Sequence, residues 1–267
     1  MEGCDSSARF SLYLDDLDTT VLQAEELLGF FDQDSVTGCV EFALQRATVV
    51  DIDAWRKVCR AKHGSPIGMA GVRFLDRDGL AIGTIDVFEF AVVEVDDSVA
   101  AMSGDRFDVR LTGIGSREWS SISAALWRER QVGGPTEMNT WVGLPRSGCR
   151  EWLSVALAAG SRAQVDHQLT DRQAGVCYTL DAAHIDDEVS FFCALGEAIN
   201  GPGGYFGAGL DGMADCLCGD FGATVPFSIR CDDWHGLVER LGKPFVDAVE
   251  EVFQHQGVKI VKELLSG

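Results

Sequence analysis

The pattern of apolar and polar positions divides the chain into two parts. Before about residue 160, short runs rich in Val, Ile, Phe and Leu alternate in part with polar residues, which is typical of strands. After about residue 175, apolar residues recur at helical spacing between short strand-like runs. The polar segment 161–175 lacks an apolar period. We therefore predict two domains, residues 1–160 and 176–267, joined by a linker at 161–175.

The first part predicts a β-rich domain of the α+β class. Its apolar runs are short and rich in β-branched and aromatic residues, and helix-like segments lie between some of them. The expected strands are Phe10–Leu14, Cys39–Leu44, Val72–Leu75, Ala81–Val95 and Arg106–Leu111; the expected helices are Asp53–Ala61, Glu118–Glu129 and Arg150–Ala159, the last of them closed by Gly160.

A weak internal similarity suggests that this domain is duplicated. The segment Leu12–Asp15 resembles Arg73–Asp76 at an offset of about 61 residues, and a second pair of strand-like segments recurs at a longer offset. A repeat of 8–70 in 71–148, with insertions in the second copy, would explain both pairs. Chance similarity between β-rich stretches explains them equally well.

The second part predicts a small α/β domain. Strands separated by helices need crossover connections, so the sheet is expected to be parallel, with three strands and about four helices. The expected strands are Val176–Leu180, Val225–Cys231 and Val258–Leu264; the expected helices are His184–Ile199, Gly209–Cys218, Trp234–Leu241 and Phe245–His255, with Asp232 or Asp233 as an N-cap and Gly257 as a helix end.

Charge and cysteine content narrow the class of partner and the compartment. The formal charge of −20 disfavours direct binding of nucleic acid or anionic membranes and favours basic proteins, although acidity is also a common means of staying soluble. Nine cysteines, an odd number, lie mostly in apolar surroundings and do not suggest a disulfide framework. The start of the chain is polar, and no apolar run reaches membrane-spanning length. We expect a reduced cytoplasmic protein.

One predicted helix carries two acidic residues without a basic neighbour. On a helix, one face holds Leu210, Met213 or Ala214, and Leu217. Asp211 and Asp215 share another face and lie about 6 Å apart along the axis. No basic residue lies at a nearby helical spacing, so these carboxylates suit an external cation. A plain solvated face is the other interpretation, and these residues alone favour it.

The residues around this helix resemble the signature of the barstar family. An aromatic pair and a glycine lead into Leu-Asp, a second Asp, a Leu and a final Gly: Tyr205, Phe206, Gly207, Leu210, Asp211, Asp215, Leu217 and Gly219. The resemblance extends over about Val176 to Leu265, with the predicted strands and helices in the family's order. Barstars are small α/β proteins that inhibit guanyl-preferring microbial ribonucleases of the barnase kind.

The resemblance implies a role for each residue of the signature. Asp215 would replace an RNA phosphate in the ribonuclease active site and pair with arginine and histidine side chains. Asp211 would contact a neighbouring basic or backbone group, and Tyr205 would pack on a catalytic histidine. The whole expected partner-binding set is Tyr205, Gly207, Gly209, Leu210, Asp211, Ala214, Asp215, Gly219, Asp220 and His255.

Three positions depart from the family. Ala214 and Asp220 stand where members often carry aromatic residues, and His255 replaces an acidic residue of the last helix. These departures put the identity and affinity of the target ribonuclease in doubt. They keep open an alternative, in which the domain binds another basic protein without inhibiting it and the first domain is regulatory.

Other motifs predict no catalysis, metal or cofactor. The glycine-rich segment Gly201–Gly209 lacks the Lys-Ser/Thr of a phosphate-binding loop, and Cys216, Cys218 and Cys231 lack a paired ligand set. The acidic run His184–Glu188 is interpreted as a helix start. Residues 1–160 resemble no family that we recognise. The leading hypothesis is an intracellular inhibitor of immunity or antitoxin type, not an enzyme.

Overall fold

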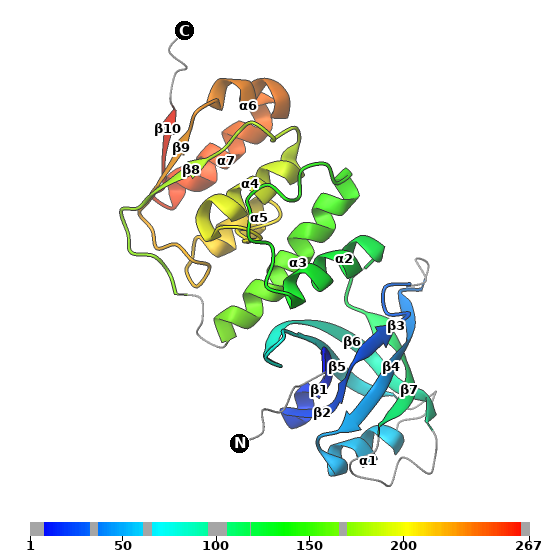
Figure 1. The fold of residues 1–267 in the computed structure, drawn as a ribbon. Coiled ribbons are helices and arrows are strands. Elements are labelled where there is room, and N and C mark those ends of the chain that lie inside the picture. The colour runs from blue at the N-terminus through cyan, green and yellow to red at the C-terminus, as the bar shows by residue number, and fades with distance from the viewer. Residues whose placement is uncertain are drawn as a thin grey trace. The chain divides into compact units, whose positions relative to one another are not determined.

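The chain folds into two compact units. The computed structural model describes residues 8–32, 37–60, 66–95, 106–117, 119–165 and 170–262 (Figure 1). The units comprise residues 1–133 and 134–267, so the division precedes the linker expected at 161–175. Helix α3 (Arg146–Val165) enters that segment and passes through Gly160. An interior glycine costs a helix only about 1 kcal/mol, which explains why Gly160 does not end it.

The first unit is built on one antiparallel sheet. Its strand order is β2-β1-β5-β6-β7-β4-β3, and an additional pairing of β2 with β4, through Leu22 and Val49, closes the sheet on itself. Closure leaves fewer free strand edges. The strands are β1 (Phe10–Leu14), β2 (Thr19–Ala24), β3 (Glu26–Leu28), β4 (Cys39–Val49), β5 (Ile67–Leu75), β6 (Ala81–Val95) and β7 (Phe107–Gly115).

Two helices and a short 3-10 turn complete this unit. They are η1 (Asp15–Leu17), α1 (Ile52–Arg60) and α2 (Ser121–Gln131). Trp127 of α2 stacks on Phe74 of β5, with ring centroids 4.2 Å apart and an interplanar angle of 13°. The proposed duplication of 8–70 in 71–148 is not shown; β5, β6 and β7 lie together in the sheet between the pairs β2-β1 and β4-β3, and β5 spans the expected boundary between the copies.

The second unit contains the three-stranded parallel sheet that the sequence predicts. Its strand order is β10-β9-β8, and both pairings are parallel. The elements that follow α3 are β8 (Cys177–Leu180), α4 (Glu188–Asn200), α5 (Leu210–Cys216), β9 (Ser228–Cys231), α6 (Trp234–Leu241), α7 (Lys243–His255) and β10 (Lys259–Lys262).

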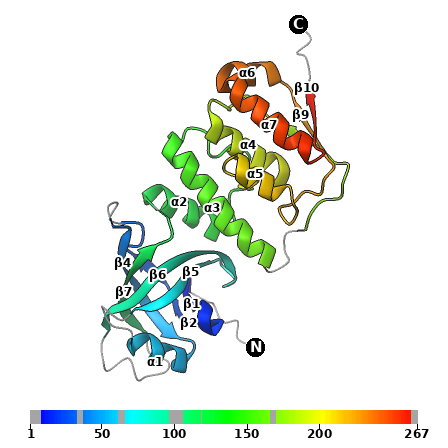
Figure 2. The same cartoon turned by 180° about the vertical axis from the view of Figure 1, so that it is seen from behind.

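Helices cover one face of this sheet. Along β8, Tyr178 and Leu180 are buried while Cys177 and Thr179 are exposed, and β9 shows a similar alternation. Strand β8 is therefore covered on one side only. In both views the strands lie along one side of the unit and α4 to α7 lie on the other (Figures 1 and 2).

Side-chain caps set the helix ends in this unit. Asp187 accepts a hydrogen bond from the Ser190 amide in a capping box, so α4 begins at Glu188 rather than at the expected His184. Asp233 caps α6 as predicted, by accepting from the amide of Gly236. Gly257 follows α7 with a φ of 78°. Within the described ranges, no helix is long and apolar enough to cross a membrane.

Helix α4 is buried around most of its surface because α3 packs against it. All residues from Val189 to Glu197 are buried, although the sequence predicts only an amphipathic stripe. The packing partner α3 lies before the predicted domain. The folded unit therefore includes residues 134–175 as an extension of the expected α/β domain.

Candidate protein-binding surface

The acidic helix α5 presents its predicted buried face to the interior. Gly209 stands at its N-cap in an extended conformation, and its carbonyl accepts from the Met213 amide at 2.9 Å. Met213 is fully buried and Leu217 is 2% exposed, while Leu210 is half-buried. Apolar burial on this face fixes the orientation of a helix too short to be stable by itself.

The opposite face exposes both acidic side chains. Asp211 and Asp215 are exposed, and neither carboxylate makes a hydrogen bond or an ion pair with any residue that the structure describes. Asp233 provides a contrast, because its carboxylate pairs with Arg240 at 3.1 Å. The α5 pair is thus available to a partner outside the described part of this unit.

A glycine allows the preceding loop to lie against α5. Gly207 has a φ of 94°, and a Cβ atom there would lie 2.6 Å from the Met213 amide nitrogen. Burial, with a smaller contribution from the Asp215 carboxylate, raises the pKa of the nearby Cys216 thiol to about 12. Burial therefore keeps Cys216 a neutral thiol of the core.

The Tyr205 side chain reaches α5 beside the acidic pair. The Tyr205 hydroxyl lies close to the helix at Gly212, where a Cβ atom would be 3.5 Å from it. The Asn200 amide donates to the carbonyl oxygens of Tyr205 at 2.8 Å and Phe221 at 2.9 Å. Asn200 therefore holds together the segments before and after α5.

The turn after α5 is held by a residue of the expected linker. The Asp171 carboxylate accepts from the amides of Asp220 at 2.9 Å and Gly222 at 2.7 Å. Asp220 has a φ of 66°, a conformation that Asp tolerates better than most residues. The Phe221 ring then lies 6.3 Å from the Tyr205 ring. Sequence reasoning missed Asp171 and Phe221. Phe221 could have been found, because it directly follows Asp220, the position where family members often carry an aromatic residue.

The remaining expected residues occupy different positions. Ala214 is half-buried on α5, and Gly219 follows the helix with a φ of 117°. His255 lies in the last turn of α7, a helix that packs against α5. Its side chain is exposed and makes no hydrogen bond or ion pair with a described residue. The structure thus groups nine of the ten predicted residues around α5 and leaves His255 on a neighbouring element.

A buried glutamate supports the loop that leads to this surface. Glu197 is 1% exposed, and its Oε2 accepts from the Trp141 indole at 2.9 Å and the Asn139 amide at 2.8 Å. Its Oε1 accepts from the Gly203 amide at 3.0 Å. Sequence reasoning missed this role, because Trp141 and Asn139 lie more than fifty residues before Glu197.

The described residues show no arrangement suited to metal binding. No group of three or more His, Cys, Asp or Glu side chains converges within the described ranges. The surface around α5 contains two exposed carboxylates, the rings of Tyr205 and Phe221, and small residues. Exposed carboxylates of this kind suit charge-assisted hydrogen bonds with basic side chains.

Comparison with known proteins places this surface inside a recognised family segment. Residues 176–261 match the family model described as Barstar (barnase inhibitor), which confirms the resemblance predicted from the sequence. The N-terminal part matches no family model. Neither the search of curated proteins nor that of solved structures finds a match to the chain.

Proposed function

We propose that this protein inhibits a basic microbial ribonuclease of the barnase kind by covering its active site with α5. The observation that carries the proposal is the pair Asp211 and Asp215. Both are exposed and make no ion pair within the described residues, and both lie inside the segment that matches a family of barnase inhibitors.

The chemistry of the surface fits an enzyme that binds RNA phosphate. A carboxylate presents two acceptor oxygens, so Asp215 takes the place of a phosphate and pairs with an arginine fork by charge-assisted hydrogen bonds. Asp211 contacts a second basic or backbone group. Gly212 and Ala214 lie beside the pair, and their small side chains allow the ribonuclease to approach the helix closely.

The overall charge supports fast recognition. A formal charge of −20 attracts a basic ribonuclease at long range and repels RNA, the competing ligand of that enzyme. In this proposal the chain acts inside the cell as an immunity or antitoxin protein, and it binds neither nucleic acid nor membranes directly.

The test combines the full chain with a barnase-type ribonuclease from the same organism. We expect equimolar protein to abolish RNA cleavage and to form a one-to-one complex on gel filtration. The matched control is the double variant Asp211→Asn and Asp215→Asn, which keeps the shape of the side chains and removes their charge. Undiminished cleavage together with no complex would overturn the proposal.

A second candidate is a module that binds another basic protein without inhibiting an enzyme. It is favoured by Ala214 and Asp220, which offer little aromatic area to anchor a ribonuclease. In that case the N-terminal unit regulates the interaction. Complex formation with the ribonuclease while RNA cleavage continues would support this candidate over inhibition.

A further inference from the structure

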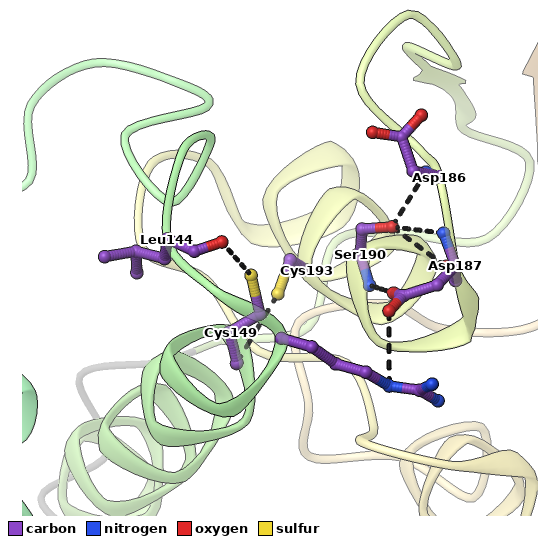
Figure 3. Close-up of polar contacts among 7 residues, drawn as sticks. Leu144, Cys149, Asp186, Asp187, Ser190 and Cys193 are labelled. Carbon is purple, nitrogen blue, oxygen red and sulfur yellow. Dashed lines mark hydrogen bonds and ion pairs between the residues drawn. The ribbon is translucent and has the colours of Figure 1, made fainter.

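Two cysteines face each other between α3 and α4. Cys149 and Cys193 point toward one another in Figure 3. The Cys193 thiol donates to the Cys149 carbonyl oxygen at 3.7 Å, and the Cys149 thiol donates to the Leu144 carbonyl oxygen at 3.8 Å. Both sulfurs thus lie in one small polar cluster that joins the extension to the α/β domain.

The two thiols differ in access. Cys149 lines an open pocket of about 170 Å³, together with Arg146, His184, Asp187 and Ser190. Cys193 is fully buried and does not line this pocket. A single water needs only about 10–15 Å³, so the pocket admits a molecule as small as hydrogen peroxide. A reagent that enters it meets Cys149 first.

Their surroundings also favour Cys149 as the reactive thiol. The hydrogen bond with the Cys193 thiol lowers the pKa of Cys149, against the opposing effects of burial and the Asp187 carboxylate. The same hydrogen bond and burial raise the pKa of Cys193. Both pKa directions agree with the difference in access, because Cys149, which lines the pocket, is also the thiol whose pKa is lowered.

Two other buried cysteines of the unit, Cys216 and Cys231, do not line the pocket and have raised pKa values. Burial raises the pKa of Cys216 to about 12 and that of Cys231 to about 11. Neither residue lines the pocket beside Cys149. They serve as internal references for a thiol that is buried and unreactive.

We propose that Cys149 and Cys193 form a hydroperoxide-sensitive dithiol, in which Cys149 is oxidised first and Cys193 then closes a disulfide between α3 and α4. This inference goes beyond ribonuclease inhibition and does not depend on it.

The reaction consumes one hydroperoxide for each disulfide. The Cys149 thiolate attacks one peroxide oxygen; an S–O bond forms, the O–O bond breaks, and the other oxygen leaves as water after taking up a proton. Cys149 is thereby oxidised to a sulfenic acid and the peroxide is reduced. The Cys193 sulfur then attacks the Cys149 sulfur; the S–S bond forms, the S–O bond breaks, and hydroxide leaves as water with the Cys193 proton.

The disulfide would tie the extension to α4 close to the binding surface. Glu197 lies one helical turn after Cys193, and its carboxylate holds the Gly203 amide in the loop before α5. A cross-link between α3 and α4 restrains the unfolded chain across the intervening segment. We expect the oxidised chain to unfold at a higher denaturant concentration than the reduced chain.

The test uses the reduced full chain and one equivalent of hydrogen peroxide. Free thiols are then blocked, and the protein is digested without reductant for peptide mass mapping. We expect a cross-linked peptide pair that contains Cys149 and Cys193, with Cys216 and Cys231 still blocked as thiols. A variant lacking the three exposed thiols of the described residues, Cys39→Ser with Cys177→Ser and Cys218→Ser, removes the competing reactions of those thiols and should give the same cross-link.

Single variants separate the two steps. Cys193→Ser should leave Cys149 as a sulfenic acid that a dimedone-type reagent labels, and Cys149→Ser should leave Cys193 a thiol. Recovery of both cysteines as blocked thiols, or of either one cross-linked to a different cysteine, would overturn the proposal. The mapping of the unsubstituted chain gives this answer even where a variant fails to fold.

Discussion

The carboxylates of α5 and of α4 belong to the same unit but stand in opposite surroundings. Asp211 and Asp215 are exposed and have no side-chain partner among the described residues. Glu197 is buried and accepts three hydrogen bonds, from Asn139, Trp141 and Gly203. Acidity alone therefore does not distinguish a binding residue from a structural one; the donors around the carboxylate do.

The difference has a physical basis in desolvation. A carboxylate removed from water loses several kcal/mol of solvation and needs donors in fixed positions to recover it. Glu197 has three such donors on two segments, the turn with Asn139 and Trp141 and the loop with Gly203, so it holds both segments against α4. An exposed carboxylate keeps its water and loses it only when a partner supplies equivalent donors. Substitutions at the two sites should therefore change different quantities.

Glu197→Ala should give the largest effect, on folding. It removes the acceptor of three hydrogen bonds, from the buried Trp141 indole and from the Asn139 and Gly203 amides, at about 1–3 kcal/mol for each bond lost. We expect the free energy of unfolding to fall by at least about 3 kcal/mol in urea denaturation of the full chain. A loss under about 1 kcal/mol would show that water reaches the Glu197 carboxylate. The contrast between this buried carboxylate and the exposed pair of α5 would then not hold.

Asp215→Ala should give the next largest effect, on binding. Loss of charge-assisted hydrogen bonds to a ribonuclease corresponds to about 1.5–3 kcal/mol, which raises the dissociation constant about tenfold to a hundredfold. The free energy of unfolding should change by no more than about 0.5 kcal/mol, because the side chain is exposed. Calorimetric titration and urea denaturation measure the two quantities. Destabilisation without a change in affinity would make Asp215 structural.

Trp141→Phe should separate the hydrogen bond from the packing, because it removes the indole donor to Glu197 and keeps most of the aromatic ring. Glu197 Oε2 then retains only the Asn139 amide, and we expect a loss of about 1–2 kcal/mol in the free energy of unfolding. Trp152→Phe is a matched control, because its buried indole nitrogen has no hydrogen-bond partner within the described residues. Equal losses for both variants would assign the effect to packing alone.

Asp211→Ala should give the smallest effect of the four. Asp211 contacts the edge of the ribonuclease active site in the proposed complex, so its loss should raise the dissociation constant by about tenfold or less, roughly 0.5–1.4 kcal/mol. The same titration as for Asp215→Ala measures it, and an effect larger than that of Asp215→Ala would reverse the assigned roles. Folding stability should again be preserved.

Local patterns predicted much of the fold. The bounds of β1, β6 and α6 agree with expectation, since each is a continuous apolar or amphipathic run between clear polar breaks. Strands β2 and β3 were not predicted; β3 has only three residues, and β2 is held by its antiparallel pairing with β1 and by two further residue pairs with β4. The length of α3 was underestimated at Gly160, because one interior glycine costs a helix only about 1 kcal/mol and does not end it.

The candidate site was predictable where the signal is local in the chain. Tyr205, Asp211 and Asp215 lie within one short segment, so spacing and resemblance sufficed to single them out. Glu197 and Asp171 were missed, because each acts through partners that lie about fifty residues away along the chain. No periodicity carries such information, since only the folded chain brings those partners together.

The contact of Trp141 with Glu197 also limits how this gene can be rearranged. A recombination junction between residues 141 and 197 would separate the indole donor from the carboxylate that depends on it. Junctions that transfer the inhibitor-like unit intact must therefore fall upstream of Gly134, where the compact unit begins. The extension and the α/β domain would then be inherited as a single module.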